Sequence, residues 1–463
     1  MPREHEIKQK FTPTQRATRL LATAEIISVV VSLVVSRVLS PLWGTSPQDS
    51  YIQSAAVNWF LSWISFGGAL VVLLTPLSLP LANIINFPLE ETFRQFYLAR
   101  AKRYLKRSGA TVIAITGSYG KTSTKHYLHH ILDGRFRVLM TPKSYNTLLG
   151  ISRVINDVLS KDVSYEYFIA ETDAYFVGEN ARICKLVEPT IGIVMTVGPM
   201  HLERLGSMEN IATAQYEVVQ ALPPDGAAFF NGDDPVVRDM AGRGYPQTTQ
   251  FVTQKGVNGG RLEAINVQMT AEGLDFEVRD NQTGEQRSMH APLYGDHNVT
   301  NILMAAAVAH YLGMSLTEIA MRVTTLQPAE HRLIRRVMPD GTILIDDTYS
   351  ANPVGTQTAL GVLALQQQSQ NRVVVSSGMF ELGAVSDQEN HKLGERMAAV
   401  ATDVILIGAA QTQAVKKGLD DCHFAPDRIH IVSSFNEAIA IYKGILRPGD
   451  ALLMLTDLPD TYA

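Results

Sequence analysis

A cluster of glycine, lysine and hydroxyl side chains near residue 120 has the composition of a phosphate-binding loop. Residues 116–125 read TGSYGKTSTK; they follow the β-branched run 111–115 and precede apolar residues at helical spacing. A strand, a glycine-bearing turn and a helix form the context that such a loop requires. The usual pattern has one more glycine, which would fall at Ile115. A glycine-rich turn without a ligand is the alternative interpretation.

Each residue type in this loop suits one part of an ATP site. Glycines let the backbone approach a phosphate, and amides at the start of the helix donate hydrogen bonds to its oxygens. Lys121 adds a positive charge, and the Thr122 hydroxyl is a suitable ligand for Mg²⁺. The expected nucleotide contacts in the loop are Gly117, Ser118, Tyr119, Gly120, Lys121, Thr122 and Ser123.

Composition indicates a folded protein of two or three domains. The chain has 463 residues, of which 46% are hydrophobic, and its net charge of −5 gives no indication of a nucleic-acid partner. Cys184 and Cys422 lie far apart and without metal-ligand spacing, so we expect neither a disulfide framework nor a zinc site. A reducing compartment fits this usage best.

Two apolar segments, residues 20–39 and 55–81, precede the phosphate-binding loop. Each has about the 20 residues that span a bilayer. Lysine and arginine flank the pair and are absent from residues 40–54, so the positive-inside rule predicts two transmembrane helices with both termini in the cytoplasm. We therefore expect a two-pass protein of the cytoplasmic membrane, with all later domains on the cytoplasmic side. A cleaved signal peptide is the alternative, but it leaves the second segment unexplained.

The remaining chain is expected to have an α/β fold in two domains. Residues 87–108 place apolar side chains at helical spacing among basic residues, which predicts an amphipathic helix on anionic lipid or a core-packed linker. Strand-like runs at 167–170, 190–196 and 226–230 alternate with helices, which indicates a mainly parallel sheet, while 251–293 predicts a small antiparallel patch. Runs at 342–345, 372–376, 404–408, 430–432 and 451–455 predict a Rossmann-like domain. The expected divisions are an N-terminal tail with the membrane hairpin (1–86), the amphipathic linker helix (87–108), a central domain with the phosphate-binding loop (109–328) and a C-terminal domain (329–463).

Polar side chains follow two of the expected strands. Glu171 ends the run at 167–170, and His201 comes after the strand at 190–196. Open α/β sheets bind ligands at the carboxyl ends of their strands, so both residues are candidate ligands for a divalent cation beside the loop. A capping or solvated side chain is the alternative for each.

The ordered motifs of the chain resemble those of the Mur ligase family, from about residue 110 to the C-terminus. The motifs are TGSYGKT (116–122), NTLLG (146–150), VGPMHLE (197–203), NGDDP (231–235), GDHNVTN (295–301), HR (331–332), DDTYSANP (346–353) and ELG (381–383). The resemblance implies an ATP-dependent amide-forming ligase: a carboxylate attacks the γ-phosphate to give an acyl phosphate, and an amine then displaces phosphate.

The resemblance also assigns roles to residues. Lys121 would bind the β- and γ-phosphates and Asn146 would lie near the transferred phosphate. Thr122, Glu171 and His201 would hold Mg²⁺. Nucleotide contacts from later in the chain would be Asn298, Asn301, Arg332 and Asp347. The chain is most similar to the branch that adds D-alanyl-D-alanine, which implies that peptide as the amine and a muropeptide as the acceptor.

Four departures from the family pattern leave the substrates open. Gln215 stands where the family has a carbamylated lysine. Three consequences are compatible with the sequence: the glutamine oxygen is itself a metal ligand, the site binds only one metal ion tightly, or the activity is reduced. Ser350 replaces an asparagine and Gly378 an aspartate, which puts the amine in question. The membrane segments occupy the place of the domain that binds a uridine-diphosphate sugar, so the acceptor is either lipid-linked or a soluble muropeptide.

Two other functions compete with this interpretation. One is a ligase for another carboxylate, as in polyglutamate-forming relatives. The other is a catalytically weakened nucleotide-binding scaffold for cell-wall enzymes, suggested by Gln215. The joint presence of the residues expected to bind ATP and metal favours an enzyme.

Overall fold

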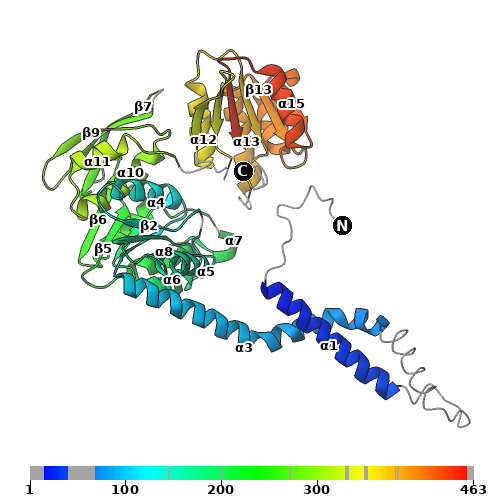
Figure 1. Ribbon diagram of the computed structural model, residues 1–463. Helices are drawn as coiled ribbons and strands as arrows, with labels where there is room; N and C mark the ends of the chain where they lie inside the picture. The colour runs from blue at the N-terminus through cyan, green and yellow to red at the C-terminus, as the bar shows by residue number, and fades with distance from the viewer. Residues whose placement is uncertain are drawn as a thin grey trace, which may run out of the picture. The chain divides into compact units, whose positions relative to one another are not determined.

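The computed structural model describes residues 15–39, 68–143, 145–200, 202–270, 273–328, 333–348, 353–380, 382 and 385–455. Two of the expected site residues, His201 and Arg332, lie outside these ranges, as does Ser350. The chain divides into two compact units, Met1–Arg100 and Ala101–Ala463 (Figure 1).

The first unit contains α1 (Gln15–Leu39) and most of α3 (Gly68–Ser108). The two helices run antiparallel, because Arg19 pairs with Glu90 at 2.6 Å while Asn86 donates to Thr23 at 3.1 Å. Among the described residues, one helical stretch, Arg16–Val35, is long and apolar enough to cross a membrane, with a mean hydropathy of 1.9. The described residues thus support only the first of the two expected transmembrane helices.

The second expected membrane segment and the expected linker helix are continuous in the structure. Residues 55–67 lie outside the described ranges, and residues 68–81 and 87–108 belong to the single helix α3. The helix contains Pro76, Pro80 and Pro88. A proline removes one backbone donor and favours a kink, and here none of the three ends the helix.

The second unit begins with a nine-stranded mixed sheet. Its first seven strands are parallel, and β8 and β9 add an antiparallel edge. In spatial order the strands are β2 (Val138–Met140), β3 (Tyr167–Glu171), β1 (Thr111–Thr116), β4 (Ile191–Val194), β5 (Ala227–Asn231), β6 (Thr248–Thr253), β7 (Leu262–Thr270), β8 (Gly273–Asp280) and β9 (Gln286–Ala291). The expected antiparallel patch is therefore the edge of the main sheet, and β6 belongs to its parallel part.

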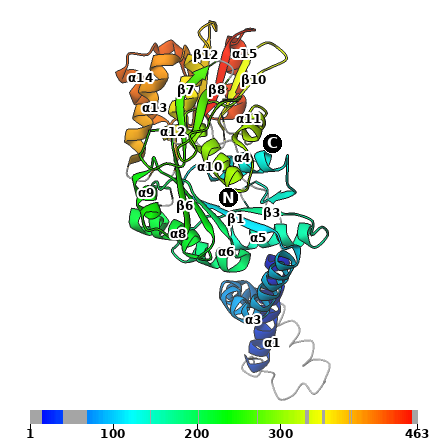
Figure 2. The same cartoon turned by 90° about the vertical axis from the view of Figure 1, so that its left-hand side faces the viewer.

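Helices cover both faces of this sheet (Figure 2). They are α4 (Lys121–Leu132), α5 (Leu148–Val154) with η4 (Ile155–Leu159), α6 (Glu179–Val187), α7 (Leu202–Leu205), α8 (Met208–Gln220), α9 (Pro235–Gly242), α10 (His297–Tyr311) and α11 (Leu316–Val323). Alternate residues of a strand face opposite sides. Accordingly Ile113 and Ile115 join the core formed with α4, α10 and α11, whereas Ala114 packs with Cys184 of α6 and Val218 of α8.

The last part of the second unit is a six-stranded sheet. Its spatial order is β10 (Ile334–Val337), β11 (Ile343–Asp346), β15 (Ala451–Leu455), β12 (Arg372–Ser376), β13 (Asp403–Ile407) and β14 (Ile429–Val432). Only β10 is antiparallel to its neighbour. One hydrophobic cluster of this sheet includes α12 (Pro353–Ala364), α13 (Ser386–Val400) and α14 (Gln413–Asp421). A separate cluster includes α15 (Phe435–Ile445). The short helix η6 (Pro426–Arg428) precedes β14. Five strands match the sequence prediction; β10 was missed because Arg335 and Arg336 interrupt its apolar pattern.

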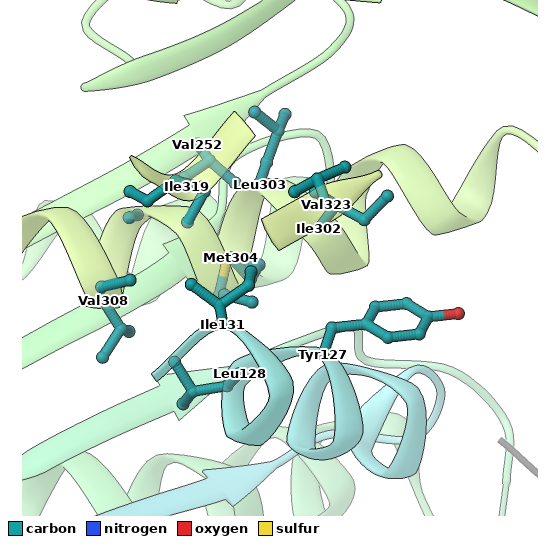
Figure 3. Packing of buried hydrophobic residues seen from close by; sticks show 14 of the residues in the cluster. Tyr127, Leu128, Ile131, Val252, Ile302, Leu303, Met304, Val308, Ile319 and Val323 are labelled. Atoms are coloured by element: carbon teal, nitrogen blue, oxygen red, sulfur yellow. The ribbon is translucent and has the colours of Figure 1, made fainter. Parts of the chain in front are cut away.

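The packing of α4 against α10 and α11 leads to a prediction about stability. Ile131 is fully buried in the cluster that α4 shares with α10 and α11, and it lies next to Met304 of α10 (Figure 3). Ile131→Ala should lower the free energy of unfolding by about 2–5 kcal/mol, because it removes buried methyl groups and leaves a cavity. Urea unfolding would measure the loss. Met321→Ala on α11, where the side chain is 62% exposed, is the matched control; equal losses in both variants would contradict the packing.

Candidate active site

The phosphate-binding loop connects β1 to α4 at the carboxyl end of the parallel sheet. Gly117 and Gly120 have φ angles of +138° and +86°, which favour glycine. A Cβ atom at Gly117 would lie 2.7 Å from the Cβ of Met195, and one at Gly120 would lie 2.6 Å from Asn301 Oδ1. Both positions therefore need glycine for its backbone freedom and for its size.

Lys121 lies in a buried polar cluster at the start of α4. Its ammonium group donates to the Gly117 carbonyl oxygen at 2.5 Å and lies 3.3 Å from Asp173 Oδ2. Asn146 Nδ2 approaches the same carboxylate oxygen at 3.5 Å. The structure thus brings together two expected residues, Lys121 and Asn146, through Asp173, which the sequence analysis missed. Its position two residues beyond β3 was the available signal.

Glu171 is held by two groups from α4. The Thr122 hydroxyl lies 3.1 Å from both carboxylate oxygens, and Lys125 Nζ lies 2.8 Å from Oε2. The Lys125 side chain is 0% exposed and that of Glu171 is 2% exposed. Burial lowers the pKa of Lys125, and the adjacent carboxylate opposes that shift only in part. Lys125 therefore orients Glu171 toward Thr122.

Thr122 and Glu171 fit the expected role in binding Mg²⁺. A hydroxyl and a carboxylate are oxygen ligands of the kind that Mg²⁺ prefers, usually together with water and phosphate oxygens. Among the described residues, no three His, Cys, Asp or Glu side chains are grouped so that they could hold a metal ion.

Asparagines at the start of α10 adjoin the loop from the other side. Tyr127 donates to Asn298 Oδ1 at 2.9 Å, and Asn301 Nδ2 donates to the same oxygen at 3.2 Å. Asn298 Nδ2 in turn donates to the Tyr294 carbonyl oxygen at 2.8 Å. These bonds set the position of α10 relative to α4, so that Asn301 faces Gly120.

Most of the expected site residues that the structure describes line one cavity of about 510 Å³, but Gly117 is not among its lining residues. Its walls include residues 118–123, Asn146, Glu171, Asn298 and Asn301, together with Asp347 from the C-terminal domain. Strand ends add residues to which the sequence analysis assigned no role: Asp173, Asn231, Asp233, Gln254 and Lys255. Gln215 is not among the residues that line this cavity; it lines a smaller neighbouring one. A volume of this size suits a small-molecule ligand.

Two family models match the part of the chain that builds this site. The model described as the Mur ligase middle domain matches residues 115–309, and the one described as the Mur ligase, glutamate ligase domain matches residues 331–456. The chain therefore belongs to the Mur ligase family, and it is an ATP-dependent ligase by class.

Curated relatives and solved structures narrow the similarity further. The UDP-N-acetylmuramoyl-tripeptide–D-alanyl-D-alanine ligase of Mycobacterium tuberculosis (strain CDC 1551 / Oshkosh) is 32% identical over 372 residues, covering 76% of this chain and 71% of that protein. The ligase of the same name from Escherichia coli (strain K12) is 31% identical over 335 residues, covering 72% of each chain. A crystal structure of MurF from Acinetobacter baumannii has 25% sequence identity and a TM-score of 0.67, and covers 80% of this chain and 79% of that one.

The buried ion pair leads to a prediction about stability. Lys125→Met should lower the free energy of unfolding by about 3–5 kcal/mol, because it leaves Glu171 as a buried carboxylate without its cation. Adding Glu171→Gln to that variant should recover most of the loss, since the uncompensated charge is then gone. Urea unfolding of the three proteins measures both effects.

A surface pair provides the control. Lys416 and Asp420 are 42% and 45% exposed, so Lys416→Met should cost less than about 1 kcal/mol. A Lys125→Met variant as stable as Lys416→Met would show that the buried pair does not stabilise the fold.

Proposed function

We propose that this ligase joins D-alanyl-D-alanine to the carboxylate of a muropeptide, at the expense of ATP. The carrying observation is the cavity that gathers the phosphate-binding loop, Thr122, Glu171 and Asn146 in a chain of this family. The relatives that share about a third of its residues over most of the chain carry the name of that activity. Both observations support the proposal.

The reaction would proceed in two steps. The acceptor carboxylate attacks the γ-phosphorus of ATP, which forms an acyl phosphate and releases ADP. The nitrogen of the amine then attacks the acyl carbon, phosphate leaves, and the nitrogen loses its proton. Such chemistry depends on positioning and charge stabilisation more than on covalent help from the protein.

Each expected site residue would have one role in binding ATP, Mg²⁺ or the transferred phosphate. Lys121 binds the β- and γ-phosphates, and Asn146 lies beside the phosphate in transfer. Thr122, Glu171 and His201 hold Mg²⁺, which supplies charge neutralisation when it is bound. Nucleotide contacts would come from Asn298, Asn301, Arg332 and Asp347.

We further propose that two helices hold the ligase at the cytoplasmic membrane. The residues buried where α1 meets α3 are small or polar: Ala24, Ser28, Ser32, Ser78 and Ala82. Many large apolar residues of the two helices are exposed instead: Leu21, Ile26, Val29, Val30, Val31, Val34, Leu77, Leu81, Ile84, Ile85 and Phe87. A water-soluble helix pair has the opposite arrangement. Small residues at the contact and apolar residues outside are typical of helices packed in lipid.

The flanking charges support a topology for this anchor. Lysine and arginine precede α1 and are frequent in the last part of α3, and residues 40–54 contain none. We therefore propose two passes through the membrane, with both termini and the ligase domains in the cytoplasm. The acceptor would then be a muropeptide that is lipid-linked or soluble at that surface.

The ligase proposal predicts that detergent-solubilised full-length protein releases ADP only when acceptor and D-alanyl-D-alanine are both present. Lys121→Ala should lower kcat by on the order of 100-fold or more, because the charge on the transferred phosphate loses its partner. Lys161→Ala, at an exposed lysine outside the cavity, is the matched control. Release of ADP with glutamate but not with D-alanyl-D-alanine would instead favour a polyglutamate-type ligase.

The membrane proposal predicts that the protein stays in the membrane pellet after alkaline carbonate treatment. Val30→Lys should weaken this retention, because a charge in the apolar outer face costs about 2.5–3.5 kcal/mol near the centre of a bilayer. Val337→Lys is the matched control, since Val337 is 63% exposed on β10.

An impermeant thiol reagent tests the topology of the same protein. Cys422 is exposed and should react only after the cells are opened, whereas Ser46→Cys should react in intact cells. Complete extraction of the wild-type protein by carbonate, or labelling of Cys422 in intact cells, would contradict the anchor as proposed.

A further inference from the structure

A small cavity of about 10 Å³ lies beside the phosphate-binding loop, next to the main cavity. Ser118 of the loop, Asn180 of α6 and Gln215 of α8 line it, with several apolar side chains. Gln215 is 7% exposed and Asn180 is 0% exposed. Asn180 Oδ1 and Gln215 Oε1 are buried and have no hydrogen-bond partner. Buried polar atoms normally have one, so this pair calls for an explanation.

The surrounding hydrogen bonds decide which way both amides face. Asn180 Nδ2 donates to the Ala214 carbonyl oxygen at 2.8 Å and to Thr116 Oγ1 at 3.3 Å, which commits its two protons. Gln215 Nε2 donates to Ser118 Oγ at 3.0 Å. That hydroxyl also accepts from the Gly198 amide at 2.9 Å and donates its one proton to the Gly198 carbonyl oxygen at 3.0 Å. No proton of Ser118 is left for the Gln215 oxygen, which therefore stays turned away from Ser118.

We propose that Gln215 positions the phosphate-binding loop through Ser118, and that one buried water molecule between Gln215 Oε1 and Asn180 Oδ1 completes the contact. The inference rests on the proposed function, because it concerns how the loop is held for a nucleotide. A water molecule has two protons for the two oxygens, and the cavity has about the volume that one water needs. The proton of the Thr116 hydroxyl can supply the third hydrogen bond.

A divalent cation suits this space less well than water. Mg²⁺ takes six oxygen ligands in near-ideal octahedral geometry and gives up its own water reluctantly. Besides the two amide oxygens, the lining contributes Thr116, Asp173 and the already committed Ser118 hydroxyl, and it is otherwise formed by Ala174, Met200, Leu205, Ile211 and Ala214. Gln215 thus acts on the loop and does not touch the nucleotide cavity.

The contact matters because Ser118 ties the loop to the chain that follows β4. Its amide donates to the Thr196 carbonyl oxygen at 2.6 Å, and its hydroxyl is bonded to both polar backbone atoms of Gly198. Gln215 adds the bond that comes from α8. Without the bond from Gln215, the Ser118 hydroxyl keeps its two partners on the Gly198 backbone. It loses the hydrogen bond that holds the phosphate-binding loop against α8.

Nucleotide binding by the full-length protein tests the positioning role. Gln215→Met keeps the length of the side chain and removes both polar atoms. We expect it to raise the Kd for ADP about tenfold, with and without Mg²⁺ alike, because one hydrogen bond to the loop is lost. Gln220→Met, at an exposed position at the end of the same helix, is the matched control. Titration calorimetry measures each Kd.

Ser118→Ala tests the same bond from its other end. In that background Gln215→Met should change the Kd little further, because the two residues act through one hydrogen bond. Gln215→Met alone should also raise the KM for ATP more than it lowers kcat. If Gln215→Met fails to fold, an ADP affinity of Ser118→Ala equal to that of the wild-type protein would overturn the inference.

Other outcomes separate this inference from the proposed function. An unchanged Kd in Gln215→Met overturns the positioning role, and a loss seen only with Mg²⁺ would make Gln215 a metal ligand instead. A high-resolution crystal structure should show the water in the wild-type protein; an empty cavity overturns that part. If the wild-type protein binds no ADP, the proposed function fails first.

Discussion

The active site depends on a fully buried ion pair between Lys125 and Glu171. Removing two charges from water is costly, so such a pair persists only with close contact and additional hydrogen bonds. Here Lys125 also donates to the Lys143 carbonyl oxygen at 2.5 Å, and Glu171 faces the Thr122 hydroxyl. The pair thus ties the first turns of α4 to the end of β3 and to the segment that leads to Asn146. The side chains proposed to contact one phosphate are held in register by this contact.

A second set of contacts fixes the loop from the opposite side. Gly117 passes so close to Met195 that no side chain fits, and Tyr127 links α4 to Asn298 of α10. Beneath these contacts, α4, α10 and α11 share the largest hydrophobic cluster of the described residues. The polar site therefore rests on a rigid apolar base, which is what a reaction dominated by positioning requires.

The helix pair of the first unit buries small residues and exposes large apolar ones, which is the opposite of the packing in the ligase domains. The hydrophobic cores of the ligase domains consist largely of large apolar side chains, whereas α1 and α3 bury alanine and serine and expose valine, isoleucine and leucine. With the helix pair in the membrane as proposed, the same physical principle explains both arrangements, because the surrounding solvent differs. Water drives large apolar groups inward, and lipid removes that force, so that close packing of small residues brings the helices together.

Much of the site was determined by local sequence. The loop between β1 and α4 was predictable because a phosphate-binding loop needs glycine, lysine and threonine at that spacing within one short segment. Five of the six strands of the C-terminal sheet were predictable because each is a continuous apolar run. Asp173, Lys125 and the edge strand β10 were not predictable in this way. Their roles come from contacts between segments far apart in the chain: Lys125 with Glu171, Asp173 with Lys121, and β10 with β11. Likewise, sequence identified Gln215 as unusual, but only the tertiary structure showed that its amide faces Ser118 and not the nucleotide cavity, because burial and hydrogen-bond partners exist only in the folded chain.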